Sequence, residues 1–353
     1  MKRFRIIAAI IAFLLCLSSC GKAESSSADE QWRIVTGFEN ICHGGELWAD
    51  DSGRLCFTDF SSLATALVCP YPNCTHSSSD SCPAFGMDNH PIMTDDSIYF
   101  FKVEYGYGKN GKPTADTTVS KANLDGTNRS IIATISGKAV EYQERIAVFG
   151  STLYFCAKET IESGSNLYGE KAKHTLCSFD LTTGDFRELA LLCEGYSGGT
   201  WLYGVYNDKI IISAGASPEA IEWTDMAALD NIEPTCYSYD LATQSLEESD
   251  LPQPISVQAG YYFYAENGEI VVITPDGDKK TLPGINPESN FSVVNDKVFA
   301  FGKGYDLESG QSFEMKSKKA VAAYLDGKYI LKSFDYDTQR NEYEAVEDKE
   351  LVG

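Results

Sequence analysis

The chain has 353 residues and a formal net charge of −22, from 51 acidic and 29 basic residues. A surface this acidic repels nucleic-acid phosphates, and no basic patch interrupts it, so the composition excludes nucleic acid as a natural partner. About 320 residues follow the polar segment near the N-terminus, which is enough for a large hydrophobic core.

Residues 1–19 are predicted to be an export signal. Lys2, Arg3 and Arg5 precede an uncharged apolar run, residues 6–17, which is shorter than the roughly 20 residues that a spanning helix needs. The run ends in Leu17-Ser18-Ser19-Cys20-Gly21, which resembles the lipobox of bacterial lipoproteins. The alternative is a plain secretory signal with an incidental cysteine.

The lipobox resemblance implies that Cys20 is diacylated and that the peptide is cut before it. Lipid chains would then hold the mature protein on the extracytoplasmic face of the cell membrane. Residues 20–31 comprise the lipidated cysteine and a polar tether, which lacks the apolar residues needed to offset the entropy of ordering. Residues 32–353 are left as one folded domain.

From residue 32 onward the pattern is typical of an all-β protein. Aromatic and β-branched runs such as 97–101, 152–156 and 297–301 are separated by Gly, Asp, Asn, Thr and Ser. Many of these units end in an aspartate turn, and seven such aspartates recur: Asp59, Asp125, Asp180, Asp240, Asp276, Asp306 and Asp335. Their mean spacing of about 46 residues fits the four-stranded blade of a β-propeller.

We therefore expect residues 32–353 to form a single β-propeller of four-stranded antiparallel blades. Seven blades are favoured, with six or eight as alternatives. The last two aspartate intervals are only about 30 residues, which predicts trimmed blades. We expect the strand at Trp32–Val35 to complete the last blade and close the ring.

Each repeat aspartate is predicted to have a local role. Its carboxylate can accept the backbone N–H two residues further on, while a following Gly, Asn or Gln supplies the left-handed position of a hairpin turn. No copy carries the full pattern of a calcium-binding loop.

A family resemblance supports this fold. Residues Lys121–Asn128 contain Leu-Asp-Gly-Thr-Asn, which resembles the strand turn of YWTD-type propellers in low-density-lipoprotein-receptor-like domains, although the Tyr-Trp-Thr-Asp tetrad is absent. Bacterial surface lipoproteins, especially from gut clostridia, carry similar domains. The resemblance implies fold and location, and it does not imply a ligand.

The stretch from Cys69 to Ala84 contains the residues most suited to chemistry. Cys69, Cys74, His76 and Cys82 could surround one tetrahedral zinc ion, and such a filled Cys₃His set would be structural because it leaves no open position. The segment resembles one that recurs in the clostridial lipoproteins. The alternatives are a disulfide from Cys82 to Cys69 or Cys74, and reduced free thiols.

The remaining candidate side chains are predicted to be structural. Buried cysteine behaves as a small hydrophobe, which we expect of Cys56, Cys156, Cys177, Cys193 and Cys236. His43, His90 and His174 are predicted at turns or on the surface. The glycine-rich segment 106–113 is expected to be a hairpin loop, because strand-like runs flank it where a phosphate loop needs a helix.

No catalytic residue is identified from the sequence, which contains no nucleophile elbow and no H-E-x-x-H helix. We expect a membrane-anchored binding or scaffolding module with a protein or glycan ligand. The first alternative is an extracytoplasmic glycoside hydrolase or lyase that uses carboxylates in the propeller funnel. A further alternative is an envelope-assembly or sensory lipoprotein that contacts other proteins.

Overall fold

The structure is a computed structural model of the whole chain. It describes residues 32–35, 40–42, 44–50, 52–76, 82–84, 90–94, 96–108, 113–140, 145–162, 170–222, 226–337 and 340–352. Cys20, with the predicted signal and tether, and His43 lie outside these residues. Within them, no helix has the length and apolar character needed to cross a membrane.

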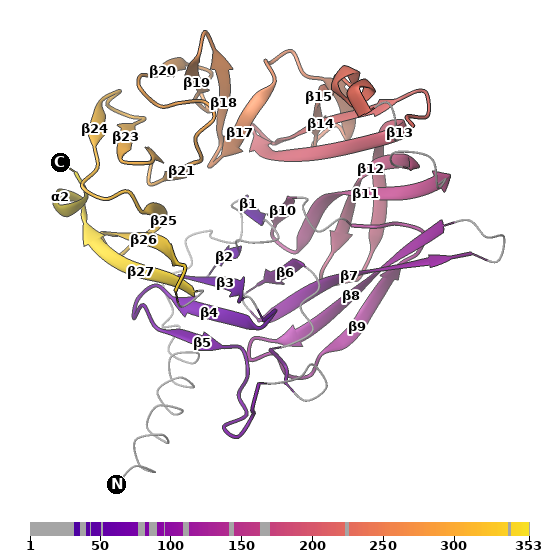
Figure 1. Cartoon of the computed structure of the whole chain (residues 1–353), viewed down its shortest axis with the longest axis horizontal. Helices are drawn as coiled ribbons and strands as arrows, with labels where there is room; N and C mark the ends of the chain where they lie inside the picture. Colours follow the sequence, from indigo (N-terminus) through magenta and orange to yellow (C-terminus); the bar gives the residue numbers. More distant parts are fainter. Residues whose placement is uncertain are drawn as a thin grey trace.

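The described residues form a β-propeller of seven antiparallel blades around a central axis (Figure 1). Blades 1 and 2 are β2 (Asn40–Cys42), β3 (Gly45–Ala49), β4 (Leu55–Asp59) and β5 (Thr65–Leu67), then β6 (His90–Met93), β7 (Ser97–Tyr107), β8 (Pro113–Asn123) and β9 (Ser130–Ile135). Blades 5 and 6 are β17 (Pro254–Gln258), β18 (Tyr261–Glu266), β19 (Glu269–Ile273) and β20 (Lys279–Leu282), then β21 (Phe291–Val294), β22 (Lys297–Ala300), β23 (Lys303–Asp306) and β24 (Ser312–Glu314). The strands of blade 6 are only three or four residues long, which confirms the trimming that the interval from Asp276 to Asp306 predicts.

Blades 3 and 4 share a single strand. Blade 3 contains β10 (Ile146–Phe149), β11 (Thr152–Glu162), β12 (Lys171–Asp180) and the first half of β13 (Phe186–Tyr206). Blade 4 contains the second half of β13 with β14 (Lys209–Ser217), β15 (Thr235–Asp240) and β16 (Ser245–Glu248), and a 3-10 helix, η2 (Met226–Asn231), lies between β14 and β15. The outer strand of one blade thus continues as the inner strand of the next, and both belong to one eight-stranded sheet.

Blade 7 has three strands, β25 (Ala320–Leu325), β26 (Lys328–Asp335) and β27 (Arg340–Glu347). The prediction that Trp32–Val35 completes this blade is wrong. The strand β1 (Arg33–Val35) pairs with β10 in blade 3, where Val35 enters the core. Blade 7 is instead followed by the short helix α2 (Asp348–Leu351), whose Leu351 is buried against β25 and β26.

Most of the predicted aspartate turns form. The carboxylates of Asp125, Asp180 and Asp240 accept the N–H two residues on, and Gly126, Gly184 and Gln244 take the left-handed conformation. Six of the seven aspartates lie in the turn between the third and fourth strands of blades 1 to 6.

The seventh aspartate is out of phase with the others. Asp335 ends β26, the second strand of blade 7, and its turn leads to the third strand. Its side chain still accepts the N–H of Asp337 at 2.9 Å, so the local turn chemistry is as predicted although its position in the blade differs.

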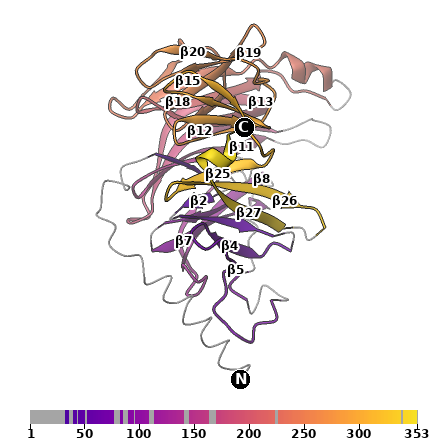
Figure 2. The ribbon, with the colours of Figure 1, turned by 90° about the vertical axis from the view of Figure 1, so that its left-hand side faces the viewer.

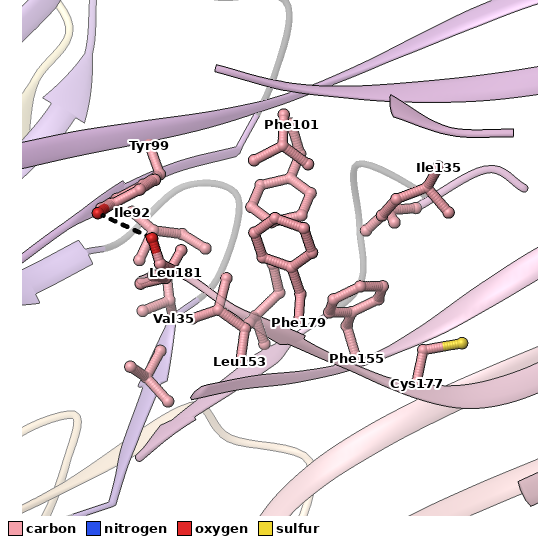
Figure 3. Close-up of a cluster of buried hydrophobic side chains, with 14 of the residues drawn as sticks. Val35, Ile92, Tyr99, Phe101, Ile135, Leu153, Phe155, Cys177, Phe179 and Leu181 are labelled. Carbon is pink, nitrogen blue, oxygen red and sulfur yellow. Dashed lines mark hydrogen bonds between the residues drawn. The ribbon is translucent and has the colours of Figure 1, made fainter. Parts of the chain in front are cut away.

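The hydrophobic core is divided among the interfaces between blades. Between blades 2 and 3, Phe101 packs edge-on against Phe155 and Phe179, with ring centroids 5.7 and 6.0 Å apart (Figure 3). The hydroxyl of Tyr99 in blade 2 donates to the carbonyl of Leu181 in blade 3 at 3.5 Å. Alternation along each strand explains this arrangement, because each sheet turns one side-chain face toward each neighbouring blade.

Among the described residues, side chains rather than a shared strand join the last blade, blade 7, to the first, blade 1. Glu46 on β3 of blade 1 is fully buried. Its carboxylate accepts from the ammonium of Lys332 at 2.6 Å and from the hydroxyl of Tyr343 at 2.9 Å, and both partners belong to blade 7. Phe60 packs against Tyr343 beside this contact, and Figure 2 shows blade 7 lying over blade 1.

We expect Lys332→Met to destabilise the fold by about 3–5 kcal/mol, because it leaves the buried Glu46 carboxylate without its cation. Urea denaturation measures the loss. Tyr343→Phe removes only one hydrogen bond and should cost about 1–3 kcal/mol.

The control is Lys102→Met, which removes the exposed ion pair to Glu104 at 3.1 Å. An exposed pair contributes about 0–1 kcal/mol. A loss in Lys332→Met no larger than in this control would contradict the closure by Glu46.

Candidate metal centre and interblade cleft

The cysteine–histidine segment lies in the connection from blade 1 to blade 2, residues 68–89, the longest between described strands. Val68 and Ala84, which flank the four predicted ligands, are both held by one residue at the start of β4. The N–H of Leu55 donates to the carbonyl of Ala84 at 2.9 Å, and the N–H of Val68 donates to the carbonyl of Leu55 at 2.8 Å. These two bonds bring the ends of the segment together at the edge of blade 1.

The structure brings all four predicted ligands together. One ligand atom from each of Cys69, Cys74, His76 and Cys82 lies within 4.8 Å of all the others, and His76 Nδ1 is 3.2 Å from Cys82 Sγ. Cys82 is buried, and the other three are half-buried. Thiolates bound to a single zinc stand roughly 3.8 Å apart when each Zn–S bond is about 2.3 Å, so only a small contraction would be needed.

The surroundings of the thiols differ. Burial raises the pKa of the Cys69 thiol to about 12. The pKa of Cys74 is lowered, chiefly because the backbone N–H of His76 donates to its sulfur. Among the described residues no disulfide joins Cys69, Cys74 or Cys82. A metal binds thiolates, so Cys74 is better prepared than Cys69 to bind one.

The other predicted cysteines and histidines have structural positions. Cys56, Cys156 and Cys177 are buried as expected, whereas Cys193 and Cys236 are only half-buried. The prediction that His174 lies at a turn or on the surface is wrong, because it is buried in the middle of β12. The backbone of His90 begins β6.

A cleft of about 500 Å³ opens between blades 3 and 4, and sequence reasoning did not find it. Its lining residues come from β11, β12, the first half of β13, β15 and the turn that follows β15. The repeat motif marks only Asp180 and the turn residues around it, and it predicts turns rather than a cleft. The other lining residues are strand positions that come together only when the two blades pack.

Strand alternation explains how the cleft arises. On the face of β12 toward blade 4, Leu176 belongs to the core between the blades, whereas Ser178 and Asp180 line the cleft. On β11, Cys156 is likewise in the core, and Tyr154 lies at the boundary. The apolar core thus stops short of the rim, where polar side chains replace it.

The groups that line the cleft are largely available for hydrogen bonding. Among the described residues, neither the hydroxyls of Tyr154 and Tyr239 nor the guanidinium of Arg187 has a hydrogen-bond or ion-pair partner. Burial raises the pKa of both tyrosines, so their hydroxyls stay protonated at neutral pH. The pKa of Asp180 is lowered, chiefly because the N–H of Thr183 donates to it.

Comparison with known proteins gives the fold only. No protein-family model and no curated protein matches the sequence. Similar solved structures include an oligogalacturonate lyase from Vibrio parahaemolyticus, at 10% identity and TM-score 0.46, over 88% of this chain and 90% of that one. Another is a nidogen/laminin complex, at 10% identity and TM-score 0.35, over 76% of this chain and 91% of that one. A third is the propeller domain of the Trilobed protease from Pyrococcus furiosus, at 12% identity and TM-score 0.34, over 73% of this chain and 81% of that one. Likenesses this distant carry no argument about function.

We expect iodoacetamide to modify Cys74 faster than Cys69 in reduced, metal-free protein at about pH 8, because the thiolate is the nucleophile and only the pKa of Cys74 is lowered. Peptide mass spectrometry over a time course measures both rates. Cys236, a half-buried thiol whose pKa burial raises, is the slow internal reference. Modification of Cys69 at the rate of Cys74 or faster would contradict the assignment.

Proposed function

We propose that this protein is an extracytoplasmic lipoprotein, held on the cell membrane through Cys20, whose propeller acts as a binding or scaffolding module. The signal-like residues 1–19 and the lipobox support the anchor. A rigid ring of blades joined to a lipid by a short polar tether presents its surface close to the membrane.

The observation that carries the binding function is the cleft between blades 3 and 4. Its walls belong to one continuous sheet, because β13 passes from blade 3 into blade 4 without a loop. The walls are therefore held in place before a ligand arrives, which lowers the entropy cost of binding.

The same cleft favours binding over glycoside cleavage. A glycosidase needs one carboxylic acid whose pKa is raised so that it can protonate the leaving group. The pKa of Asp180 is lowered by the turn that it caps, and Glu188 forms an ion pair with Lys138 at 3.3 Å. Neither of these carboxylates has the surroundings of a general acid, and the third carboxylate of the cleft, Asp185, is exposed rather than set in an apolar pocket.

We also propose that Cys69, Cys74, His76 and Cys82 bind one structural zinc ion. The segment contains many Pro and Ser residues and has no core of its own, so a metal would supply the order that packing does not. The convergence of the four ligand atoms within 4.8 Å supports this proposal.

We expect protein purified with reductant and without chelator to contain close to one zinc per chain. Cys74→Ser should lose most of it, because three ligands bind zinc far more weakly than four. Cys236→Ser, which alters a half-buried thiol outside the cluster, is the matched control and should keep its zinc. Elemental analysis decides, and a zinc content that Cys74→Ser leaves unchanged would sink the proposal.

For the anchor, we expect Cys20→Ala to release the protein from the membrane fraction, because it removes the site of lipidation. The released protein should still capture the same envelope component as the wild type when each is used as bait, and that component should be recovered unaltered. Fractionation and mass spectrometry of the captured material measure both results.

Lys2→Gln is the matched control, since it leaves the lipobox intact. Unchanged membrane retention of Cys20→Ala would contradict the anchor. Capture of nothing by either protein, or recovery of a cleaved product, would contradict the binding function.

A further inference from the structure

We infer that the cleft between blades 3 and 4 binds a neutral oligosaccharide, an inference that rests on the proposed binding function and names its ligand class. The cleft has a volume of about 500 Å³. This is within the range of about 300–1,000 Å³ for small-molecule sites, and it suits a ligand of a few sugar units.

The chemistry of the walls matches a polyhydroxylated ligand. A sugar hydroxyl both donates and accepts, so it needs donors and acceptors side by side. The cleft offers the guanidinium of Arg187 as a donor, the carboxylate of Asp185 as an acceptor, and the hydroxyls of Tyr154 and Tyr239 as either.

Two of these hydroxyls are set in an otherwise buried environment. Tyr239 is only 2% exposed, and its ring lies in the core between the blades. Tyr154 is half-buried and packs against Trp32, with ring centroids 5.6 Å apart. Buried polar groups almost always have a partner, so tyrosine hydroxyls that line a cleft without a protein partner are suited to a ligand.

The charges of the cleft point to a neutral ligand. Asp180 and Asp185 line the cleft with a single cation, Arg187, in a chain whose net charge is −22, and the third carboxylate of the lining, Glu188, is paired with Lys138. An anionic sugar would meet like charge from Asp180 and Asp185, whereas the guanidinium opposes binding of a metal cation. A neutral sugar meets neither penalty, and it can hydrogen-bond to both kinds of group.

The floor of the cleft fits the less polar face of a sugar ring. Leu189 and Leu241 line the cleft and pack against the core between blades 3 and 4. The C–H groups of a pyranose can rest on this apolar floor while its hydroxyls reach the polar rim, so a single ligand would use both parts of the cleft.

The test is calorimetric titration of the mature lipoprotein, purified in a detergent without a sugar headgroup. The probes are the neutral tetrasaccharides of cellulose, xylan, mannan, starch and chitin, with tetragalacturonate as the acidic comparison. We expect at least one neutral probe to bind and tetragalacturonate not to bind.

Cleft variants test the location. Arg187→Ala should weaken binding about tenfold or more, and Tyr154→Phe about fivefold or more, because each removes hydrogen bonds to the ligand. Arg340→Ala and Tyr336→Phe change the same residue types in blade 7, and they should bind like the wild type. Arg187 is exposed, so its replacement should leave the fold intact, which a melting curve checks.

Binding of no neutral probe, binding of tetragalacturonate alone, or binding that the cleft variants leave unchanged would each overturn the inference. If the wild type binds no neutral probe yet captures an envelope component, the ligand class is wrong and the binding function stands. If the wild type binds no neutral probe and also captures no envelope component, both the ligand class and the binding function are wrong.

Discussion

Closure of the ring depends on the contact between the buried Glu46 carboxylate of blade 1 and Lys332 and Tyr343 of blade 7. Each blade of a propeller packs only against its two neighbours, so the first and last blades must meet for every interface to be satisfied. Here no described strand crosses that seam, and the helix after blade 7 packs onto blades 6 and 7. A fully buried carboxylate must have its charge balanced, which Lys332 does and Tyr343 assists. The arrangement fixes which residues of the last blade face the first one.

On the opposite side of the ring, neighbouring blades are joined by the backbone, whereas blades 7 and 1 are joined by side chains. Blades 3 and 4 share β13, so their relative position is set by hydrogen bonds along one eight-stranded sheet. Blade 5 also approaches blade 4 closely at Gly204, in the second half of β13. A side chain there would place its Cβ 2.4 Å from the carbonyl oxygen of Val257 in blade 5, which leaves room only for glycine. A cleft built on such a backbone is held in shape by the sheet itself, which favours the proposed binding function.

The cysteine–histidine segment brings a third kind of constraint to the same molecule. It connects the seam blade to its neighbour, and Leu55 holds both of its ends. Backbone hydrogen bonds close the segment at its base, while the four converging side chains gather its interior. Apolar packing between blades, a buried ion pair between blades 1 and 7, and the convergence of four proposed metal ligands in one connection are thus three different constraints on the ring.

The sequence by itself determined the features that depend on residues close together along the chain. Strand alternation, the aspartate turns and the blade period are local, and they predicted seven blades even though Asp335 occupies a different turn from the other six. Cys69 and Cys82 are close in sequence, so the convergence of the four proposed ligands could also be foreseen. Tertiary structure alone decided the rest: the pairing of β1 with β10, the burial of His174, the partnership of Glu46 with a lysine 286 positions away, and the cleft. These features depend on which faces of neighbouring blades come into contact. Every blade fits the same local repeat pattern, so the pattern cannot tell which residues of different blades will meet.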